Sequence, residues 1–485
     1  MYVSGTDCHG TPITERAKKE KKNPKDIADY YHKRDKETLE SFDFSYDLYT
    51  YTDTDFHKQA VMKMFRKMYD NGYIYEKIEP QPYCEHCQKF LSDRELKITC
   101  PKCGTETKAE QCDNCQYVPT IEDMKDGICL ECGSKTVLKD NKNLYLELSK
   151  FQKAIEEYVK ENDGLWRVNA KNETNKYLKQ GLVDRAVTRD LDWGVDIPVE
   201  GYENKKMYVW IEAVLGYITA TMKRCEETGK NWEEFWKEEY NPTIYMVHGK
   251  DNIVFHSIIF NALLMAMEDN FHLVNTIVSS EYLNINDEKI SKSKGNGTPA
   301  IELVAKYGSD PLRFHMINNG PEKKDSNFTI DALIATNNGE LLNKFGNLVN
   351  RTLKFKDLDT LPEGKLDEEI KKKIEETYKE VGQDIENLEF KSASDKAMQL
   401  VEIANKYYDD QKPWVQRKED IDEFNNTIYT CATIIANLSN IFEPFMPKAC
   451  EKIRKYLQIE DKSWDLFMPK ANIKLENIEP LFVRL

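Results

Sequence analysis

Apolar and polar positions alternate along residues 1–70 as they do in an α/β protein. A short apolar strand at 2–3 leads into a turn at 5–7, and helices are expected near Ala17 and over 26–41. A further helix is expected over 56–70, because apolar residues recur there at helical spacing. These residues are Phe56, Ala60, Met64, Phe65 and Met68.

The same pattern returns after residue 205. Continuous apolar runs over 207–211, 243–247 and 275–279 are typical of buried strands, and a helix through about Met267 follows the second run. Strands that alternate with helices predict an α/β fold with a doubly wound parallel sheet. The segment 72–205 is then an insertion between two halves of one sheet.

Three segments are expected at the carboxyl ends of these strands, which is where doubly wound sheets bind ligands. They are Gly5-Thr-Asp7, Trp210 and Gly249-Lys-Asp251. Their residues are therefore candidates for a ligand site.

Residues 331–485 have helical spacing almost throughout. Apolar residues such as Leu341 and Phe345, or Ile428 and Ile435, recur at intervals of three, four or seven. This spacing predicts a helical bundle at the end of the chain. The chain thus divides into 1–71, 72–205, 206–282, 283–330 and 331–485.

The composition is that of a soluble globular protein, with 40% hydrophobic and 32% charged residues. No apolar run approaches the roughly 18 residues that suggest a membrane span. Residues 1–5 have neither the charged nor the apolar region of a secretion signal. We therefore expect a cytoplasmic protein without a membrane partner. The net charge of −15 argues against a protein that coats nucleic acid through bulk charge.

Eight of the twelve cysteines form four Cys-x-x-Cys pairs within 84–132. Each pair can hold two corners of a tetrahedron, so eight thiols suit two zinc ions. Redox or disulfide pairs are the alternative, which the missing secretion signal disfavours. Spacing leaves both a sequential and a nested pairing open. The pairs are Cys84 and Cys87, Cys100 and Cys103, Cys112 and Cys115, and Cys129 and Cys132.

A lysine-rich segment, Lys289-Ile-Ser-Lys-Ser293, continues into Lys294-Gly295. Its ammonium and hydroxyl groups suit a polyphosphate, because they can neutralise charge that spreads over phosphate oxygens in a transition state. A solvated lysine-rich surface is the alternative.

Together these segments resemble those of the methionyl-tRNA synthetases, a family of class I aminoacyl-tRNA synthetases. The lysine-rich segment is similar to the family's KMSKS loop, and the similarity covers essentially the whole chain in order. It implies a Rossmann-type sheet, interrupted by a zinc-binding connective insertion and followed by a helical anticodon-binding domain. The other segments that carry it are 5–12, 208–217, 249–256, 346–351 and 412–414.

The resemblance implies a methionine pocket at the strand ends. Asp7 matches the carboxylate that binds the ammonium group of methionine. Trp210, Ala213, Tyr217 and His256 match the wall of the pocket. Packing in an ordinary core is the alternative for the two aromatic residues.

The resemblance also implies a site for ATP with Mg²⁺. Gly249 and Asp251 match the nucleotide-binding turn, in which a glycine permits close approach of the backbone. Lys292 matches the lysine that contacts the ATP phosphates, and Lys289 accompanies it in the catalytic loop.

Asn347 and Arg351 are four residues apart and so share one face of a helix. The resemblance makes them readers of a CAU anticodon in the partner tRNA, with Trp414 as a platform for an unstacked base. A local side-chain pair on a solvated surface is the alternative. Family members with one zinc keep the site that matches the inner four cysteines, which favours the nested pairing. A monomer is expected.

One family signature does not occur in the sequence. Class I synthetases carry a His-x-Gly-His motif at a helix start that binds the ATP phosphates, and no two of the eight histidines are three residues apart. We expect a start codon assigned too late or a fragment, and little ATP–pyrophosphate exchange from a chain that begins at Met1. A catalytically inactive tRNA-binding protein and a paralogous class I synthetase are the alternative functions.

Overall fold

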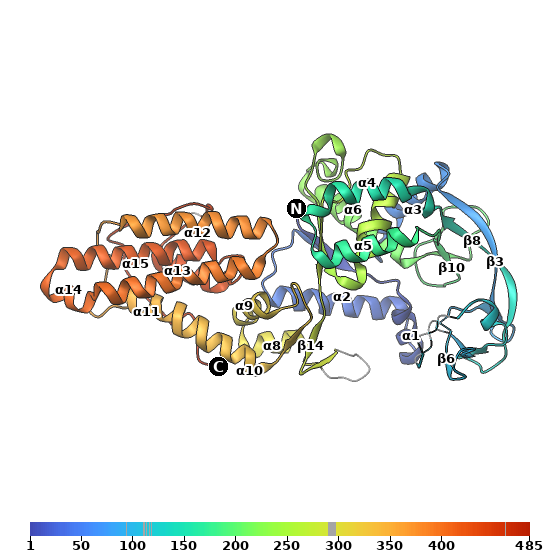
Figure 1. Ribbon diagram of the computed structural model, residues 1–485, viewed down its shortest axis with the longest axis horizontal. Helices are drawn as coiled ribbons and strands as arrows, with labels where there is room; N and C mark the ends of the chain where they lie inside the picture. Colours follow the sequence, from blue (N-terminus) through green and yellow to red (C-terminus); the bar gives the residue numbers. More distant parts are fainter. Residues whose placement is uncertain are drawn as a thin grey trace.

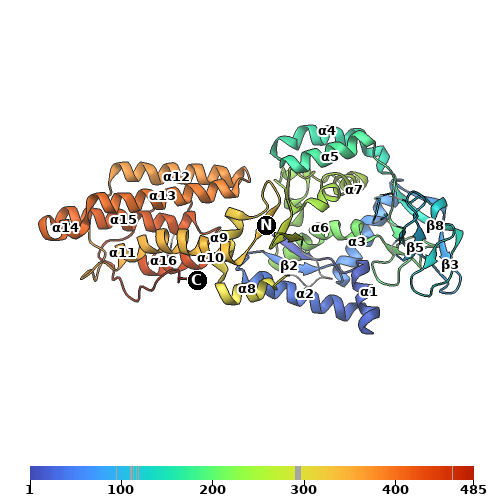
Figure 2. The same cartoon turned by 60° about the horizontal axis from the view of Figure 1, so that its bottom comes forward.

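The computed structural model describes residues 1–93, 95–109, 112, 114–115, 117, 119–289, 297–460 and 462–485. Figure 1 shows an elongated molecule with an α/β part and a helical bundle at opposite ends. In both views the tip of a β-rich insertion lies on the side of the α/β part that faces away from the bundle (Figures 1 and 2). Among the described residues, no helix is long and apolar enough to cross a membrane.

The first half of the α/β part has the predicted order of elements. Asn23 caps one helix through the amide of Lys25, and Thr54 caps the next through the amide of His57. Short polar caps of this kind explain why the helices begin where they do. The elements are β1 (Val3–Thr6), α1 (Thr11–Glu20), α2 (Pro24–Ser41), β2 (Leu48–Tyr51) and α3 (Asp55–Asp70).

The buried face of α3 differs in part from the prediction. Phe65 and Met68 are buried as expected, but His57 and Val61 complete this face, and Phe56 is only partly buried. A histidine is buried here because both of its ring nitrogens have hydrogen-bond partners on α6.

The second half repeats the alternation of strand and helix. β12 pairs in parallel with β13, and the helix between them begins with a π-helical segment at Phe255–Ile259. The predicted strands over 243–247 and 275–279 are thus confirmed, with small shifts of their ends. The elements are β10 (Thr188–Arg189), β11 (Lys206–Met207), α6 (Val209–Thr228), β12 (Tyr245–Gly249), α7 (Phe260–Ala266) and β13 (Thr276–Ser280).

The strand predicted over 207–211 is wrong, because the chain becomes helical at Val209. A short apolar run does not distinguish a buried strand from a buried helix, and the period becomes visible only further along. Ile211, Leu215 and Ile218 then lie on one helical face that is almost inaccessible to solvent. Trp210 therefore lies in the first turn of a helix and not at the end of a strand.

The two halves are joined by packing. In the described chain β1 pairs with β2 and β12 with β13, and these are two separate parallel pairs in place of the one continuous sheet predicted. Helix α6 contacts β1, β2 and α7, so it lies between the pairs. One hydrophobic core runs from Val61 to Ile277 through both halves.

The insertion is a long antiparallel ribbon with a small cysteine-rich tip. β3 (Ile74–Cys84) and β8 (Val137–Leu146) form the ribbon, which pairs from Ile74 with Leu146 to Tyr83 with Val137. Two helices, α4 and α5, follow the ribbon within the insertion. The remaining elements are β4 (Lys89–Phe90), β5 (Leu96–Thr99), β6 (Glu106–Lys108), β7 (Ile128–Cys129), α4 (Gln152–Asn162), α5 (Val168–Gln180) and β9 (Arg185–Ala186).

A small sheet and two helices connect the α/β part to the bundle (Figure 1). β14 pairs in parallel with β16 and antiparallel with β15. The elements are β14 (Leu283–Ile285), β15 (Glu288–Lys289), α8 (Ala300–Tyr307), α9 (Ser309–Asn319) and β16 (Ser326–Phe328).

The predicted helical bundle is confirmed. Helix α15 is its central element, because nearly every residue from Phe424 to Ile441 is buried. A second hydrophobic core, separate from that of the α/β part, surrounds it. The elements are α10 (Ile330–Thr336), a π-helical segment (Asn337–Gly346), α11 (Asn347–Leu353), α12 (Glu368–Glu386), α13 (Phe390–Gln411), α14 (Pro413–Glu419), α15 (Ile421–Ile441) and α16 (Pro447–Leu457).

Candidate active site, metal clusters and nucleic-acid surface

The five residues implied for methionine line one cavity of about 290 Å³. Asp7 follows β1, while Trp210, Ala213 and Tyr217 lie along α6 and His256 lies in the π-helical segment after β12. The structure therefore brings together residues from both halves of the α/β part.

Gly5 determines how the chain reaches this cavity. A Cβ atom at Gly5 would lie 2.8 Å from the carbonyl oxygen of Thr50, closer than two such atoms can approach. Glycine thus allows β1 to lie close against β2. The turn that carries Asp7 follows β1 directly in the sequence.

The carboxyl group of Asp7 lines the cavity, although part of this residue remains exposed to solvent. Its Oδ1 atom accepts a hydrogen bond of 3.3 Å from the amide of His9. Desolvation within the cavity, followed by the negative charge of Glu212, raises the pKa of Asp7 to about 6. Asp7 is therefore an anion at neutral pH in an environment that favours a cationic partner.

The opposite wall of the cavity is aromatic and uncharged. Trp210 stacks on Phe255 with 4.4 Å between ring centroids. His256 donates from Nδ1 to the carbonyl oxygen of Asn252 (2.8 Å), so its Nε2 accepts from the hydroxyl of Tyr217 (2.8 Å). Burial, followed by the neighbouring His248, lowers the pKa of His256 to about 3. The wall thus suits an apolar, polarizable side chain.

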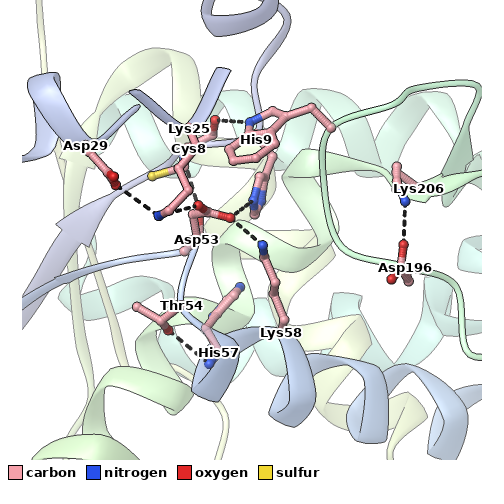
Figure 3. A network of polar contacts seen from close by, with 12 residues as sticks. Cys8, His9, Lys25, Asp29, Asp53, Thr54, His57, Lys58, Asp196 and Lys206 are labelled. Carbon is pink, nitrogen blue, oxygen red and sulfur yellow. Dashed lines mark hydrogen bonds and ion pairs between the residues drawn. The ribbon is translucent and has the colours of Figure 1, made fainter. Parts of the chain in front are cut away.

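A network of buried charges lies behind the cavity, and the sequence analysis did not find it. Asp53, just after β2, is contacted by His9 after β1, Lys25 on α2 and Lys58 on α3 (Figure 3). Glu212 on α6 contacts His9 as well. A carboxylate inside the apolar run of α6 was the one sequence signal that could have indicated this network.

Of the two residues implied for the nucleotide, Gly249 ends β12 and Asp251 follows it, lining a second cavity. The backbone of Gly249 leaves open the space in which a Cβ would lie, and Asp251 accepts a hydrogen bond from the hydroxyl of Tyr282. This cavity has about 470 Å³ and is lined by Asp251. Lys250, from the predicted Gly249-Lys-Asp251 segment, lines it too, whereas its basic residues Arg185 and Arg189 escaped the sequence analysis.

Lys250 is held in place beside this second cavity. Its ammonium group lies 2.6 Å from Glu281 and 2.8 Å from Asp325, and 3.9 Å from the ring centroid of Tyr282. Of the lysine-rich segment, Lys289 ends β15, whereas Lys292 lies outside the described residues.

The eight paired cysteines form two clusters, each of which could hold one metal ion. Within each cluster the Sγ atoms lie within 4.8 Å of one another. Four thiolates around a zinc ion, each about 2.3 Å from it, are about 3.8 Å apart, so the clusters have the right size. The clusters are Cys84, Cys87, Cys129 and Cys132, and Cys100, Cys103, Cys112 and Cys115.

The nested pairing is therefore confirmed. Cys84 lies 3.4 Å from Cys132 between Sγ atoms, and Cys103 lies 3.5 Å from Cys112. The ribbon explains the outer cluster, because its last pair, Tyr83 with Val137, brings the ends of the cysteine-rich tip together.

Two of the three residues implied for the anticodon, Arg351 and Trp414, meet around Tyr408 of α13. The guanidinium of Arg351 lies 4.1 Å from the centroid of the Tyr408 ring, and the ring of Trp414 lies 6.2 Å from it. Arg351 also donates to Asp409 (2.8 Å). Asn347 is exposed one turn before Arg351 on α11.

These contacts form a surface that offers an aromatic plane beside a fixed cation. Trp414 has 48% of its surface exposed although it lies in a folded helix. Such a surface suits a base that has left its stack. Tyr408 precedes the Lys-Pro-Trp segment by only a few residues, which is the signal that could have found it.

Two models of known protein families together match most of the chain. A family model described as tRNA synthetases class I (M) matches residues 1–353, and one described as the anticodon binding domain of methionyl tRNA ligase matches 360–480. The chain belongs to the methionyl class I tRNA synthetases. The class I synthetase match thus extends through α10 and α11 into the bundle, and the anticodon-binding match covers the rest of the bundle, from before α12 to beyond α16.

Individual relatives agree with this assignment. Methionine–tRNA ligase 1 of Alkaliphilus oremlandii is 42% identical over 488 residues, which cover 100% of this chain and 90% of the relative. The methionine–tRNA ligase of Bacillus mycoides is 43% identical over 490 residues, or 100% of this chain and 89% of the relative.

Solved structures show the same fold. Methionyl-tRNA synthetase of Mycobacterium tuberculosis bound by methionyl-adenylate superimposes with a TM-score of 0.81 at 22% identity, covering 99% of this chain and 92% of that one. The free form of that enzyme gives a TM-score of 0.75 at 20% identity, covering 100% and 98%. The predicted Rossmann-like core, insertion and helical domain are therefore confirmed.

Proposed function

We propose that this chain attaches methionine to its tRNA in two steps, through a methionyl-adenylate intermediate formed from methionine and ATP. The observation that carries the proposal is the single cavity in which Asp7, Trp210, Ala213, Tyr217 and His256 meet. It pairs a carboxylate with an apolar aromatic wall, which are the two features that recognise the ammonium and the thioether of methionine.

In this proposal the protein works mainly by positioning and by stabilising charge. Asp7 binds the ammonium group, and Gly249 and Asp251 contribute to the site for ATP with Mg²⁺. The methionine carboxylate attacks the α-phosphorus of ATP, its P–O bond forms as the bond to pyrophosphate breaks, and pyrophosphate leaves. Lys289 and Lys292 are assigned to the charge that develops on the phosphates.

In the second step the terminal adenosine of the tRNA attacks the acyl carbon, and AMP leaves. Asn347, Arg351 and Trp414 are assigned to a CAU anticodon, which brings the cognate tRNA to the enzyme. The two cysteine clusters are assigned to structural zinc. The same proposal includes a monomeric state, a cytoplasmic location, and domain boundaries after residues 71, 205, 282 and 330.

Equilibrium binding and ATP–pyrophosphate exchange test the proposal together. We expect methionine to bind more tightly than leucine or norleucine. Because no His-x-Gly-His motif occurs in the sequence, we expect little exchange from this chain, and any exchange should require methionine. Methionine binding without exchange would favour a tRNA-binding protein that has lost catalysis. If the chain shows neither methionine binding nor exchange, the assignment of the cavity is overturned.

Methionine binding is expected to weaken as the pH falls below about 6. The ammonium group needs the ionised form of Asp7, whose pKa is raised to about 6 in the free protein. Each unit below this value should lower the affinity about tenfold, until the lower pKa of Asp7 in the complex is reached. Calorimetric titrations between pH 5 and 8 check this. An Asp7→Asn variant should show no such dependence, and a pH-independent affinity in the unaltered protein would contradict the role of Asp7.

Replacing Trp414 by Ala is expected to weaken binding of the cognate tRNA by about 5- to 150-fold, because stacking on one base contributes about 1–3 kcal/mol. A tRNA with another anticodon should bind weakly to both proteins. The control is Trp464→Ala, since Trp464 is also half-exposed in the bundle but packs against Tyr378 on α12. Equal losses from both substitutions would show that Trp414 only stabilises the bundle.

A further inference from the structure

Glu212 is an unusual residue in the first turn of α6, because its carboxylate is entirely buried and both of its oxygens contact histidines. Oε1 accepts a hydrogen bond of 2.8 Å from Nδ1 of His9, and Oε2 accepts one of 2.8 Å from Nε2 of His57. A buried carboxylate is costly unless it is paired, so these contacts account for its presence in an apolar helix face.

His9 lies between two carboxylates. Its Nδ1 faces Glu212 and its Nε2 faces Asp53 at 3.3 Å. Ionised carboxylates only accept hydrogen bonds, so both ring nitrogens must donate and the ring is an imidazolium. Burial alone would lower the pKa of His9, but its hydrogen bonds to Asp53 and Glu212, together with their charges, raise that pKa to about 9.

The same residue holds the turn that carries Asp7. The amide of His9 donates to the carboxylate of Asp7, while the His9 ring is tied to α6 through Glu212. On the other side of the turn, Trp193 packs edge-on against the His9 ring at 5.3 Å and donates from Nε1 to the carbonyl oxygen of Cys8 (2.9 Å). Helix α6 is also the element that carries Trp210, Ala213 and Tyr217.

We propose that the imidazolium of His9 is a positioning residue for the ammonium site, because it ties Asp7 to the helix that forms the side-chain pocket. The inference rests on the proposed binding of methionine and adds a residue that does not touch it. His9 determines how far the carboxylate that binds the ammonium lies from the wall that receives the thioether.

The charge of His9 matters as well as its shape. Glu212 and Asp53 face it directly, while His57, Lys25 and Lys58 contact these two carboxylates from α3 and α2. A neutral side chain at position 9 leaves the negative charge of Glu212 uncompensated beside Asp7. Asp7 then holds its proton up to a higher pH, and the cation site weakens near neutrality.

The test compares His9→Gln with the unaltered protein, using methionine and its deamino analogue 4-(methylthio)butanoate, and calorimetric titrations between pH 5 and 8. We expect methionine affinity at pH 7 to fall about tenfold and affinity for the analogue to change less than twofold. The pH at which methionine binding is half lost should rise by about 1 unit. The control is His272→Gln, which also removes a histidine paired with a carboxylate, Glu238, but outside the cavity. It should leave all three quantities unchanged.

Equal losses for both ligands, or an unchanged pH midpoint, would overturn the positioning role and show that His9 only stabilises the fold. A second measurement uses the unaltered protein, so it does not depend on whether a variant folds. In protein labelled with ¹⁵N-histidine, both ring nitrogens of His9 should be protonated at pH 8, and a neutral ring at that pH would overturn the inference. Failure of the unaltered chain to bind methionine would overturn the proposed function and this role with it, whereas intact binding with a neutral His9 would overturn the role alone.

Discussion

Replacing Asp7 by Asn is expected to weaken methionine binding about 100-fold, which corresponds to about 2.7 kcal/mol. The amide keeps the size of the carboxylate but not its charge, and hydrogen bonds to charged groups contribute about 1.5–3 kcal/mol. The carboxyl group lines the same cavity as Trp210 and Tyr217, so its charge lies where this proposal places the ammonium group of methionine. Isothermal titration at pH 7.5, where Asp7 is ionised, measures the loss.

Two controls isolate the charge of Asp7. Asp55→Asn removes an exposed carboxylate at the start of α3 and should leave methionine affinity unchanged. The affinity of the Asp7→Asn variant for 4-(methylthio)butanoate, which has no ammonium group, should stay the same or rise. A loss of less than threefold for methionine would mean that another group binds the ammonium.

Much of the fold could be predicted because local signals agree with the final structure. Asn23 and Thr54 are strong helix caps, and the helices that they begin were placed within two residues of their ends. The strand at 207–211 was the clearest error in the α/β part, because Met-Tyr-Val-Trp-Ile is as compatible with a buried helix as with a strand. Packing of α6 against β1, β2 and α7 decides the matter, and the local sequence does not show such packing.

The candidate site was predictable to the extent that its residues belong to recognisable segments. The residues that support the site could not be predicted from the sequence. His9 and Glu212 are 203 positions apart, and neither shows from its neighbours that it will be buried against the other. A lone histidine after a strand and a lone glutamate in an apolar helix each have many ordinary explanations. Only the fold shows that they compensate one another's charge.

The arrangement of the cysteines could be predicted from local sequence only in part. Their Cys-x-x-Cys spacing predicted two clusters of four cysteines that could each hold a metal ion, because each pair is a local feature. Which pairs join could not follow from spacing, since every Cys-x-x-Cys pair has the same form. Sequential pairing leaves 12 and 13 residues between partners, and nested pairing leaves 8 and 41. The register of the ribbon from β3 to β8 decides it by bringing Cys84 back to Cys132.

Removal of the zinc ions is expected to unfold the tip of the insertion while leaving the methionine cavity intact. In the described part of the tip, the hydrophobic core has seven buried residues, and two of these are cysteines of the outer cluster. In zinc-finger peptides, binding of a structural zinc contributes about 10–16 kcal/mol to folding, so this core depends on its metal. Treatment with a chelator should make residues 84–136 accessible to protease and leave methionine affinity within about twofold.

Metal content then tests the nested pairing. The unaltered protein should contain two zinc ions per chain, and Cys112→Ser should leave one. The double variant Cys100→Ser and Cys112→Ser is decisive, because nested pairing places both residues in the same cluster and again leaves one ion. Sequential pairing would place them in different clusters and leave none. Cys225→Ser is the control, since this buried cysteine of α6 belongs to neither cluster. Two ions should remain in that variant, and a double variant without zinc would overturn the nested arrangement.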